Sequence, residues 1–191
     1  MKPILVAYAT RAGHTRTVAE RVAETLRGRG DEVEVVDARS PPEGFDASRY
    51  GGVILAASVH LGRHEREMVT FVKEHLAALE RVPTVFLSAS LVEASVEDMT
   101  APFAKRAKAA EDVKRLVESF CHETHLHPSR IWPVAGALTF SRYGALQGFV
   151  MRRIAKTEGI DDVAHDHDFT DWSGLARFVL TIAPELERST T

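Results

Sequence analysis

The chain has 191 residues, of which 45% are hydrophobic and 27% are charged, and its net charge is −3. This length and composition predict one folded domain with a hydrophobic core. The charge argues against a basic nucleic-acid-binding domain, so we expect no nucleic-acid partner. The single cysteine excludes a disulfide framework, a four-thiolate iron–sulfur cluster and a cysteine-rich zinc site. No apolar run reaches the roughly 18 residues of a transmembrane helix. The first apolar run, at residues 4–9, is too short for a secretory signal. We therefore expect a soluble, cytoplasmic protein.

Short apolar runs alternate with helical repeats along the whole chain. Continuous apolar runs are typical of strands buried on both faces, and the alternation predicts βαβ units with a parallel sheet and helices on both faces. Residues 139–169 are longer than an ordinary connection of about 2–6 residues and predict a functional insertion in a single domain, 1–191. The predicted strands are 4–9, 33–36, 53–57, 85–91 and 134–138, and the predicted helices are 15–29, 64–80, 99–124 and a last one from Trp172.

The junction between the first strand and the first helix is the most informative segment. It reads Thr10-Arg11-Ala12-Gly13-His14-Thr15, without the lysine of a P-loop or the pattern G-x-G-x-x-G. A helix beginning here directs free N–H groups at the carboxyl end of the strand, which favours an anion. Two threonine hydroxyls and a glycine suit a monophosphate held mainly by backbone donors. The alternative is that Thr15 only caps the helix and Gly13 only turns the chain.

Two further junctions follow buried strands and carry small polar residues. One reads Ala57-Ser58-Val59-His60-Leu61-Gly62-Arg63-His64, and the other reads Ser88-Ala89-Ser90-Leu91-Val92. The carboxyl ends of parallel strands meet at one edge of a sheet, so we expect these segments to converge with the phosphate loop. Their hydroxyls and amides suit a flat, hydrogen-bonding heterocycle.

These segments carry a family resemblance. The loop at 10–15 resembles the FMN phosphate loop of flavodoxins. The segments 9–16, 57–64, 71–73, 88–92, 135–138, 142–143 and 170–172, in this order, resemble the short, flavodoxin-like branch of bacterial quinone-dependent protoporphyrinogen oxidases. The resemblance implies a flavodoxin-like, doubly wound sheet of five parallel strands in the order 2-1-3-4-5, with FMN at the carboxyl ends.

The resemblance also implies an activity and a set of cofactor contacts. The activity is FMN-dependent oxidation of protoporphyrinogen IX to protoporphyrin IX in haem biosynthesis, with menaquinone or ubiquinone as electron acceptor, on the inner face of the membrane. The implied phosphate site is Thr10, Arg11, Ala12, Gly13, His14 and Thr15; the implied ring contacts are Ala57, Ser58, Val59, His60, Leu61, Gly62, Ser88, Ser90 and Leu91, with residues 135–138 as further candidates.

The flavin carries its own reactivity, so no catalytic acid or base is required. His60 and His64 are the only candidates for assisting proton transfer, and the alternative is that His64 begins a helix and faces solvent. We expect no metal site. The histidines 122, 125 and 127 beside Cys121, and the segment 165–168, lack suitable ligand spacing and are interpreted as polar surface.

The insertion combines apolar and basic residues, and residues 144–156 predict a short amphipathic helix. This helix could make a weak peripheral membrane contact, cover a flat hydrophobic substrate, or simply pack the insertion on the sheet. Arginines could pair with the propionates of a porphyrinogen. The substrate-binding candidates are Arg63, Arg142, Tyr143, Arg152 and Arg153.

Two other functions stay open at this point. One is a flavodoxin-type FMN electron carrier, and the other is an NAD(P)H-dependent quinone or FMN reductase. His60, Arg63, His64 and Arg66 lie near the predicted flavin rim, which favours a small anionic substrate over a basic protein partner. The quinone used and a homo-oligomeric state are not decided by the sequence.

Overall fold

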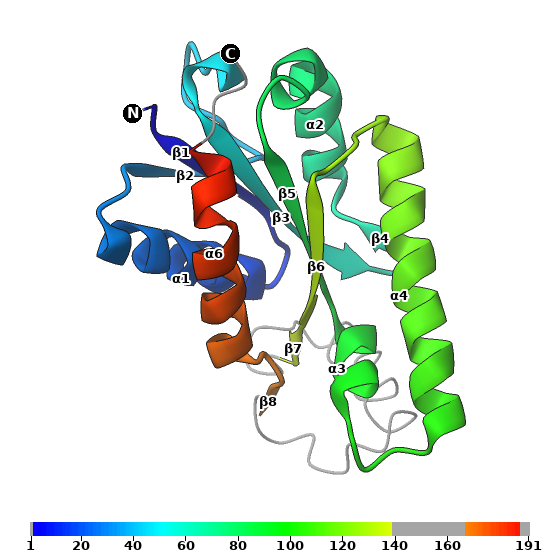
Figure 1. Cartoon of the computed structure of the whole chain (residues 1–191). Coiled ribbons are helices and arrows are strands. Elements are labelled where there is room, and N and C mark those ends of the chain that lie inside the picture. The colour runs from blue at the N-terminus through cyan, green and yellow to red at the C-terminus, as the bar shows by residue number, and fades with distance from the viewer. Residues whose placement is uncertain (1, 139–166, 188–191) are drawn as a thin grey trace.

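The computed structural model describes residues 2–138 and 167–187. Its main sheet has parallel strands in the order β2-β1-β3-β5-β6 (Figure 1). Five strands lie in the predicted spatial order, so the α/β class is confirmed, but the fifth, predicted over 134–138, begins earlier, at Arg130, and ends at Ala135. Their bounds are β1 (Ile4–Ala9), β2 (Val33–Asp37), β3 (Gly52–His60), β5 (Thr84–Ser90) and β6 (Arg130–Ala135).

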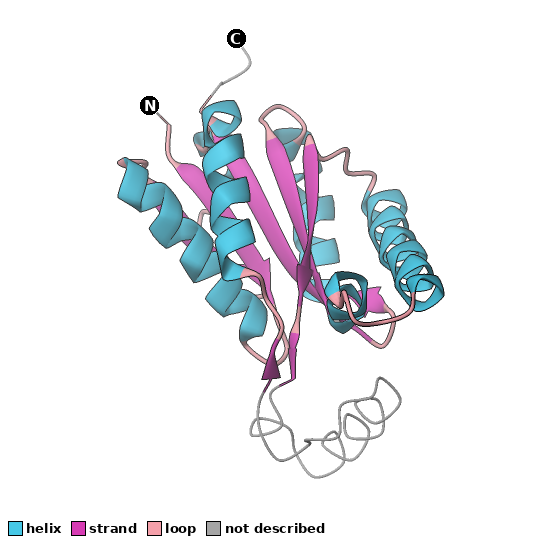
Figure 2. Cartoon of the chain, turned by 60° about the horizontal axis from the view of Figure 1, so that its bottom comes forward, coloured by secondary structure: helices cyan, strands magenta, loops and turns pink. Residues whose placement is uncertain are grey.

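Helices cover both faces of this sheet, which leaves the sheet as the middle of three layers (Figure 2). The side chains of β1 alternate between the two faces, so the strand contributes to two separate cores. Ile4, Val6 and Tyr8 pack in one core with α1 (His14–Arg29) and α6 (Trp172–Leu186). Leu5, Ala7 and Ala9 pack in the other with α2 (Arg66–Leu79) and α4 (Phe103–Thr124).

Several predicted boundaries were wrong near the carboxyl ends of the strands. The third strand continues beyond residue 57 to His60 and turns into β4 (Arg63–His64), which pairs antiparallel with it. The helix predicted over 64–80 therefore begins only at Arg66. Leu91 does not end a strand but opens α3 (Leu91–Glu97), because the Ser90 hydroxyl accepts the N–H of Glu93 as a helix cap. The helix predicted over 99–124 begins at Phe103.

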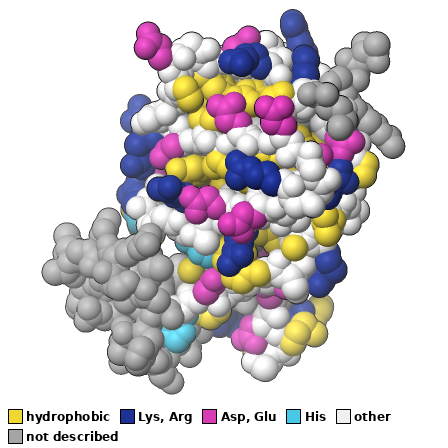
Figure 3. All heavy atoms as spheres, turned by 90° about the vertical axis from the view of Figure 1, so that its left-hand side faces the viewer, with side chains coloured by type: hydrophobic (Ala, Val, Ile, Leu, Met, Phe, Trp, Pro, Cys, Tyr) yellow, Lys and Arg dark blue, Asp and Glu magenta, His cyan; other side chains and the backbone are white. Residues whose placement is uncertain are grey.

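Three short elements complete the described chain. A 3₁₀ turn, η1 (Ala47–Arg49), precedes β3. β7 (Ala137–Leu138) pairs antiparallel with β8 (His167–Asp168), beyond the carboxyl end of the main sheet. On the face that Figure 3 shows, basic and acidic side chains are interspersed. Within the described residues, no helix is both long and apolar enough to cross a membrane.

Most of the predicted insertion lies outside the described residues. This part includes the predicted helix over 144–156 and four of the substrate-binding candidates, Arg142, Tyr143, Arg152 and Arg153.

Candidate functional site

A cavity lies where the carboxyl ends of β1, β3, β5 and β6 meet. The structure brings together the three junctions that the sequence analysis singled out, and the residues after β6 join them. The lining residues are Thr10, Arg11, Ala12, His14, Thr15, Ser58, Val59, His60, Glu65, Ala89, Ser90, Leu91, Gly136 and Ala137.

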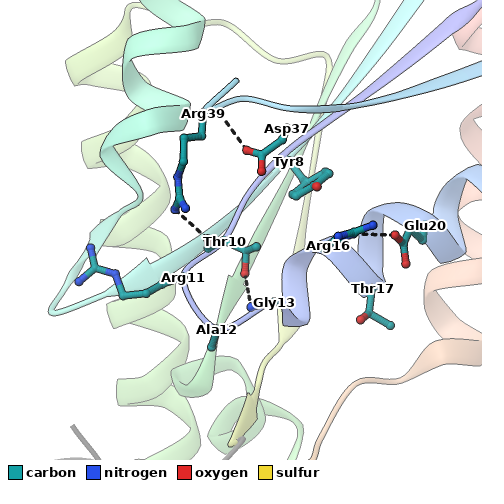
Figure 4. Close-up of a pocket in the computed structure, with 10 residues that line it drawn as sticks. All are labelled: Tyr8, Thr10, Arg11, Ala12, Gly13, Arg16, Thr17, Glu20, Asp37 and Arg39. Atoms are coloured by element: carbon teal, nitrogen blue, oxygen red, sulfur yellow. Dashed lines mark hydrogen bonds and ion pairs between the residues drawn. The ribbon is translucent and has the colours of Figure 1, made fainter. Parts of the chain in front are cut away.

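The first strand–helix junction forms a tight loop around this cavity. Gly13 has φ 89°, in the left-handed region that a residue with a side chain rarely adopts. The backbone N–H of Gly13 donates to the Thr10 hydroxyl over 3.0 Å, and α1 begins at the next residue (Figure 4). The loop thereby directs the N–H groups of the first turn of α1 at one place, as an anion site requires.

Thr15 gives the clearest sign that the cavity is built for a ligand. The residue is 1% exposed and lines the cavity, yet its hydroxyl has no hydrogen-bond partner in the described part of the chain. Buried hydroxyls nearly always find a partner, because leaving one unpaired costs about 1–3 kcal/mol. A phosphate at the start of α1 would accept hydrogen bonds from this hydroxyl and from several backbone N–H groups. The loop therefore fits a phosphate.

His14 ties the start of α1 to the segment after β8. Its Nε2 lies 2.9 Å from the Thr170 hydroxyl, and that hydroxyl donates its only hydrogen to the carbonyl of Ala135 over 2.8 Å. The ring must therefore donate from Nε2. Burial lowers the pKa of His14, while Asp168 opposes the shift. The ring is thus a neutral hydrogen-bond donor at neutral pH.

Glu65 is a cavity residue that sequence reasoning missed. Its carboxylate is buried, and among the described residues it contacts an Arg11 guanidinium nitrogen and the Ser58 hydroxyl, each at 3.4 Å. The residue was predicted to lie inside the helix 64–80, where a glutamate is normally solvated. Only the hairpin of β3 and β4, which the sequence analysis did not predict, turns it toward the strand ends.

His64 lies behind the cavity rather than at its edge. Its residue is 8% exposed, its ring packs against the stacked pair of Phe86 and Phe120, and its Nε2 lies 2.9 Å from the Ser88 hydroxyl. Burial lowers its pKa to about 4. The alternative that His64 begins a helix and faces solvent was therefore wrong. Of the two candidate histidines, only His60 lines the cavity.

Other predicted residues lie near the cavity without lining it. Ala57 and Ser88 are buried within their strands. Leu61 and Gly62 form the tip of the β3–β4 hairpin, where both have positive φ and Leu61 is 80% exposed. Arg63, in β4, is exposed beside them.

Comparison with known proteins decides the family. A family model described as a flavodoxin domain matches residues 5–163. The chain belongs to the flavodoxin family. A flavodoxin from the domain Archaea superposes with a TM-score of 0.52 at 13% identity, covering 97% of this chain and 99% of that one. This likeness concerns the fold alone, and it confirms the flavodoxin-like architecture.

Two relatives that match nearly the whole of this chain carry an enzyme name. A protoporphyrinogen IX dehydrogenase (quinone) from Escherichia coli strain K12 is 28% identical over 187 residues, which are 97% of either chain. A protein of the same name from Leishmania major is 27% identical over 184 residues, 94% of this chain and 74% of that one. The expectation of a flavin-dependent oxidoreductase of this family is confirmed by these relatives.

A second, larger hollow of about 620 Å³ shares the loop residues Thr10, Arg11 and Ala12 with the first cavity (Figure 4). Its charged side chains already have partners. The Arg16 guanidinium donates to the Glu20 carboxylate, and the Arg39 guanidinium donates to the Thr10 carbonyl. The Asp37 carboxylate accepts the backbone N–H of Arg39. None of the described residues that line it has a buried hydroxyl without a partner, which distinguishes it from the cavity at Thr15.

The described residues contain no group of three or more metal-ligating side chains. The rings of His122 and His125 lie 6.4 Å apart between centroids.

Proposed function

We propose that this protein is an FMN-dependent dehydrogenase that oxidises protoporphyrinogen IX to protoporphyrin IX and passes the electrons to menaquinone or ubiquinone. The relatives with this activity in their names match over nearly the whole chain, which supports the substrate and the acceptor. The observation that carries the cofactor is the buried, unpartnered hydroxyl of Thr15 at the start of α1. When bound, FMN supplies the redox chemistry by taking hydrogen from the substrate and giving electrons to the quinone.

The chain's own residues would bind and orient this cofactor. The phosphate would accept hydrogen bonds from the Thr15 hydroxyl and the first N–H groups of α1, with Thr10 and Gly13 fixing the loop. Segments 58–60 and 89–91 would flank the ring, because they line the same cavity. Of the two candidate histidines, His60 is the one that lines the cavity, and it would exchange a proton with solvent or substrate.

Binding of the anionic substrate would draw on basic residues around the site. Arg63 is exposed next to the hairpin tip. We extend the proposal to Arg142, Tyr143, Arg152 and Arg153, which lie outside the described residues. A weak peripheral contact of residues 139–169 with the cytoplasmic face of the membrane belongs to the same proposal, since a quinone is a membrane-borne acceptor.

Anaerobic turnover tests this function. Protein loaded with FMN is mixed with protoporphyrinogen IX and a menaquinone analogue, and the growth of porphyrin fluorescence is followed. We expect growth that requires protein, FMN and quinone together. Bound, reducible flavin without turnover would point to an electron carrier instead. Bleaching of the flavin by NAD(P)H alone would point to a general reductase.

A further inference from the structure

Two groups of opposite character line the cavity. The loop at 10–15 with the start of α1 favours an anion. The buried carboxylate of Glu65, which lies 3.4 Å from the guanidinium of Arg11 in that loop, disfavours one. We propose that Glu65 accepts hydrogen bonds from the ribityl hydroxyls of the flavin and thereby makes the pocket select a hydroxylated chain next to the phosphate. This inference rests on the proposed FMN function and adds a specificity-determining residue to it.

The backbone around Glu65 fixes where its carboxylate lies. Its N–H donates to the Ser58 carbonyl over 3.0 Å, at the point where β4 ends and α2 begins. Ser58 belongs to β3, so this bond fixes the backbone of Glu65, from which the carboxylate extends, to the carboxyl end of that strand. The Glu65 side chain is 2% exposed, and it shares the cavity with Thr15.

The contacts that this carboxylate makes within residues 2–138 and 167–187 leave acceptor capacity for a ligand. Arg11 and Ser58 approach its two oxygens to 3.4 Å, beyond the usual 2.7–3.2 Å or so of a good hydrogen bond. An ionised carboxylate offers about four lone-pair sites. Arg11 is half exposed, with 51% of its side chain accessible, so its pairing with Glu65 is partly screened by water. A buried carboxylate whose contacts are this long can accept further hydrogen bonds from a ligand. Hydroxyl groups can donate such bonds without bringing a charge into the cavity.

The arrangement also orients the ligand. A phosphate beside Glu65 would be repelled, whereas at the start of α1 it meets N–H groups and the Thr15 hydroxyl. A chain of hydroxyls leading away from the phosphate would then run past Glu65 toward the segments that flank the ring.

Three flavins separate the contributions of the ring, the hydroxylated chain and the phosphate. Lumiflavin has the ring alone, riboflavin adds the ribityl chain, and FMN adds the phosphate. We would measure the dissociation constant of each by flavin fluorescence quenching. The proteins are the wild type, Glu65→Gln, Thr15→Val and the control Glu67→Gln, whose residue lies on α2, pairs with Arg39 and does not line the cavity.

For Glu65→Gln we expect riboflavin and FMN to bind more weakly by the same factor, about five- to tenfold, with lumiflavin unchanged, because a charge-assisted hydrogen bond becomes a neutral one. For Thr15→Val we expect only FMN to weaken. Glu67→Gln should match the wild type throughout. Glu65→Asp, which keeps the charge but withdraws it by one methylene, should behave like Glu65→Gln and serves if the latter does not fold.

Two results would overturn the inference while leaving the proposed function intact. One is an unchanged riboflavin affinity in both Glu65 variants. The other is an equal loss for lumiflavin and riboflavin, because the carboxylate would then act on the ring. A wild type that binds none of the three flavins would instead contradict the proposed function itself.

Discussion

At the scale of single residues, the Thr15 hydroxyl should lower the stability of the flavin-free protein and strengthen the binding of FMN. The Thr15→Val variant keeps the shape of the side chain but removes the buried hydroxyl. We expect the flavin-free variant to be more stable by about 1 kcal/mol, because an unpaired buried polar atom disappears. We also expect its FMN affinity to fall about tenfold, because the phosphate loses a donor. Urea unfolding and fluorescence titration measure the two effects.

Thr17→Val is the matched control for this prediction. Thr17 is exposed on the next part of α1 and does not line the cavity. It should change neither quantity appreciably. A Thr15→Val protein that is less stable without flavin, or that binds FMN as tightly as the wild type, would show that the hydroxyl serves the fold rather than a phosphate.

Two buried residues give the stability of the fold a pH dependence with opposite signs. Burial lowers the pKa of His64 to about 4, so the unfolded chain takes up a proton between about pH 6.5 and 4 that the folded chain refuses, and stability falls as the pH falls. Burial, with Glu97 nearby, raises the pKa of Glu93 to about 7, so stability is lost as the pH rises from about 4.5 to 7. The two contributions oppose each other in the wild type.

Removing His64 should therefore expose the contribution of Glu93. We compare the free energy of unfolding at pH 5 and at pH 7. On going from pH 5 to pH 7, its change should be more negative by about 2 kcal/mol in His64→Gln than in the wild type. Urea titrations at both pH values measure this difference. His122→Gln, on the exposed surface of α4, is the control. Parallel pH profiles for wild type and His64→Gln would contradict the assignment of a neutral, buried ring.

At the scale of elements, the junction of β3 with α6 depends on the absence of a side chain. A Cβ at Gly52 would lie 2.5 Å from the backbone carbonyl oxygen of Leu186, closer than real atoms approach. Gly52→Ala should cost about 1–3 kcal/mol in unfolding free energy, since α6 must move away from the sheet. Gly28→Ala, in α1 with nothing within 4 Å of the new Cβ, should instead stabilise by about 0.5–1 kcal/mol. Chemical denaturation of both variants compares them, and equal effects would contradict this packing.

The elements also show what the sequence could and could not predict. The five strands and four main helices were predictable, because each carries a continuous apolar run or an apolar stripe with the correct period. The β3–β4 hairpin and α3 were not, because neither has such a pattern: Arg63 and His64 are polar, and α3 depends on the Ser90 cap. The loop at 10–15 was found from its residue types. Glu65 and the His64–Ser88 contact were missed because both depend on that hairpin.

At the scale of the whole molecule, the cavity is built from segments far apart in the sequence, so flavin binding should stabilise the entire fold. FMN at about 100 times its dissociation constant adds about 2.7 kcal/mol. For a chain of 191 residues this corresponds to a rise in melting temperature of about 5–10 °C. Calorimetry with and without FMN measures it. In Thr15→Val, where we expect FMN affinity to fall about tenfold, the same FMN concentration should add only about 1.4 kcal/mol, and an undiminished rise would place the flavin elsewhere.

The reductive half-reaction tests the proposed activity most directly. FMN-loaded protein is mixed anaerobically with protoporphyrinogen IX in a stopped-flow instrument, without a quinone, and the visible absorbance of the oxidised flavin is followed. We predict that the flavin is bleached as porphyrin forms and that a menaquinone analogue then restores its absorbance. A flavin that remains oxidised in the presence of protoporphyrinogen IX, although dithionite reduces it, would contradict the proposed dehydrogenase.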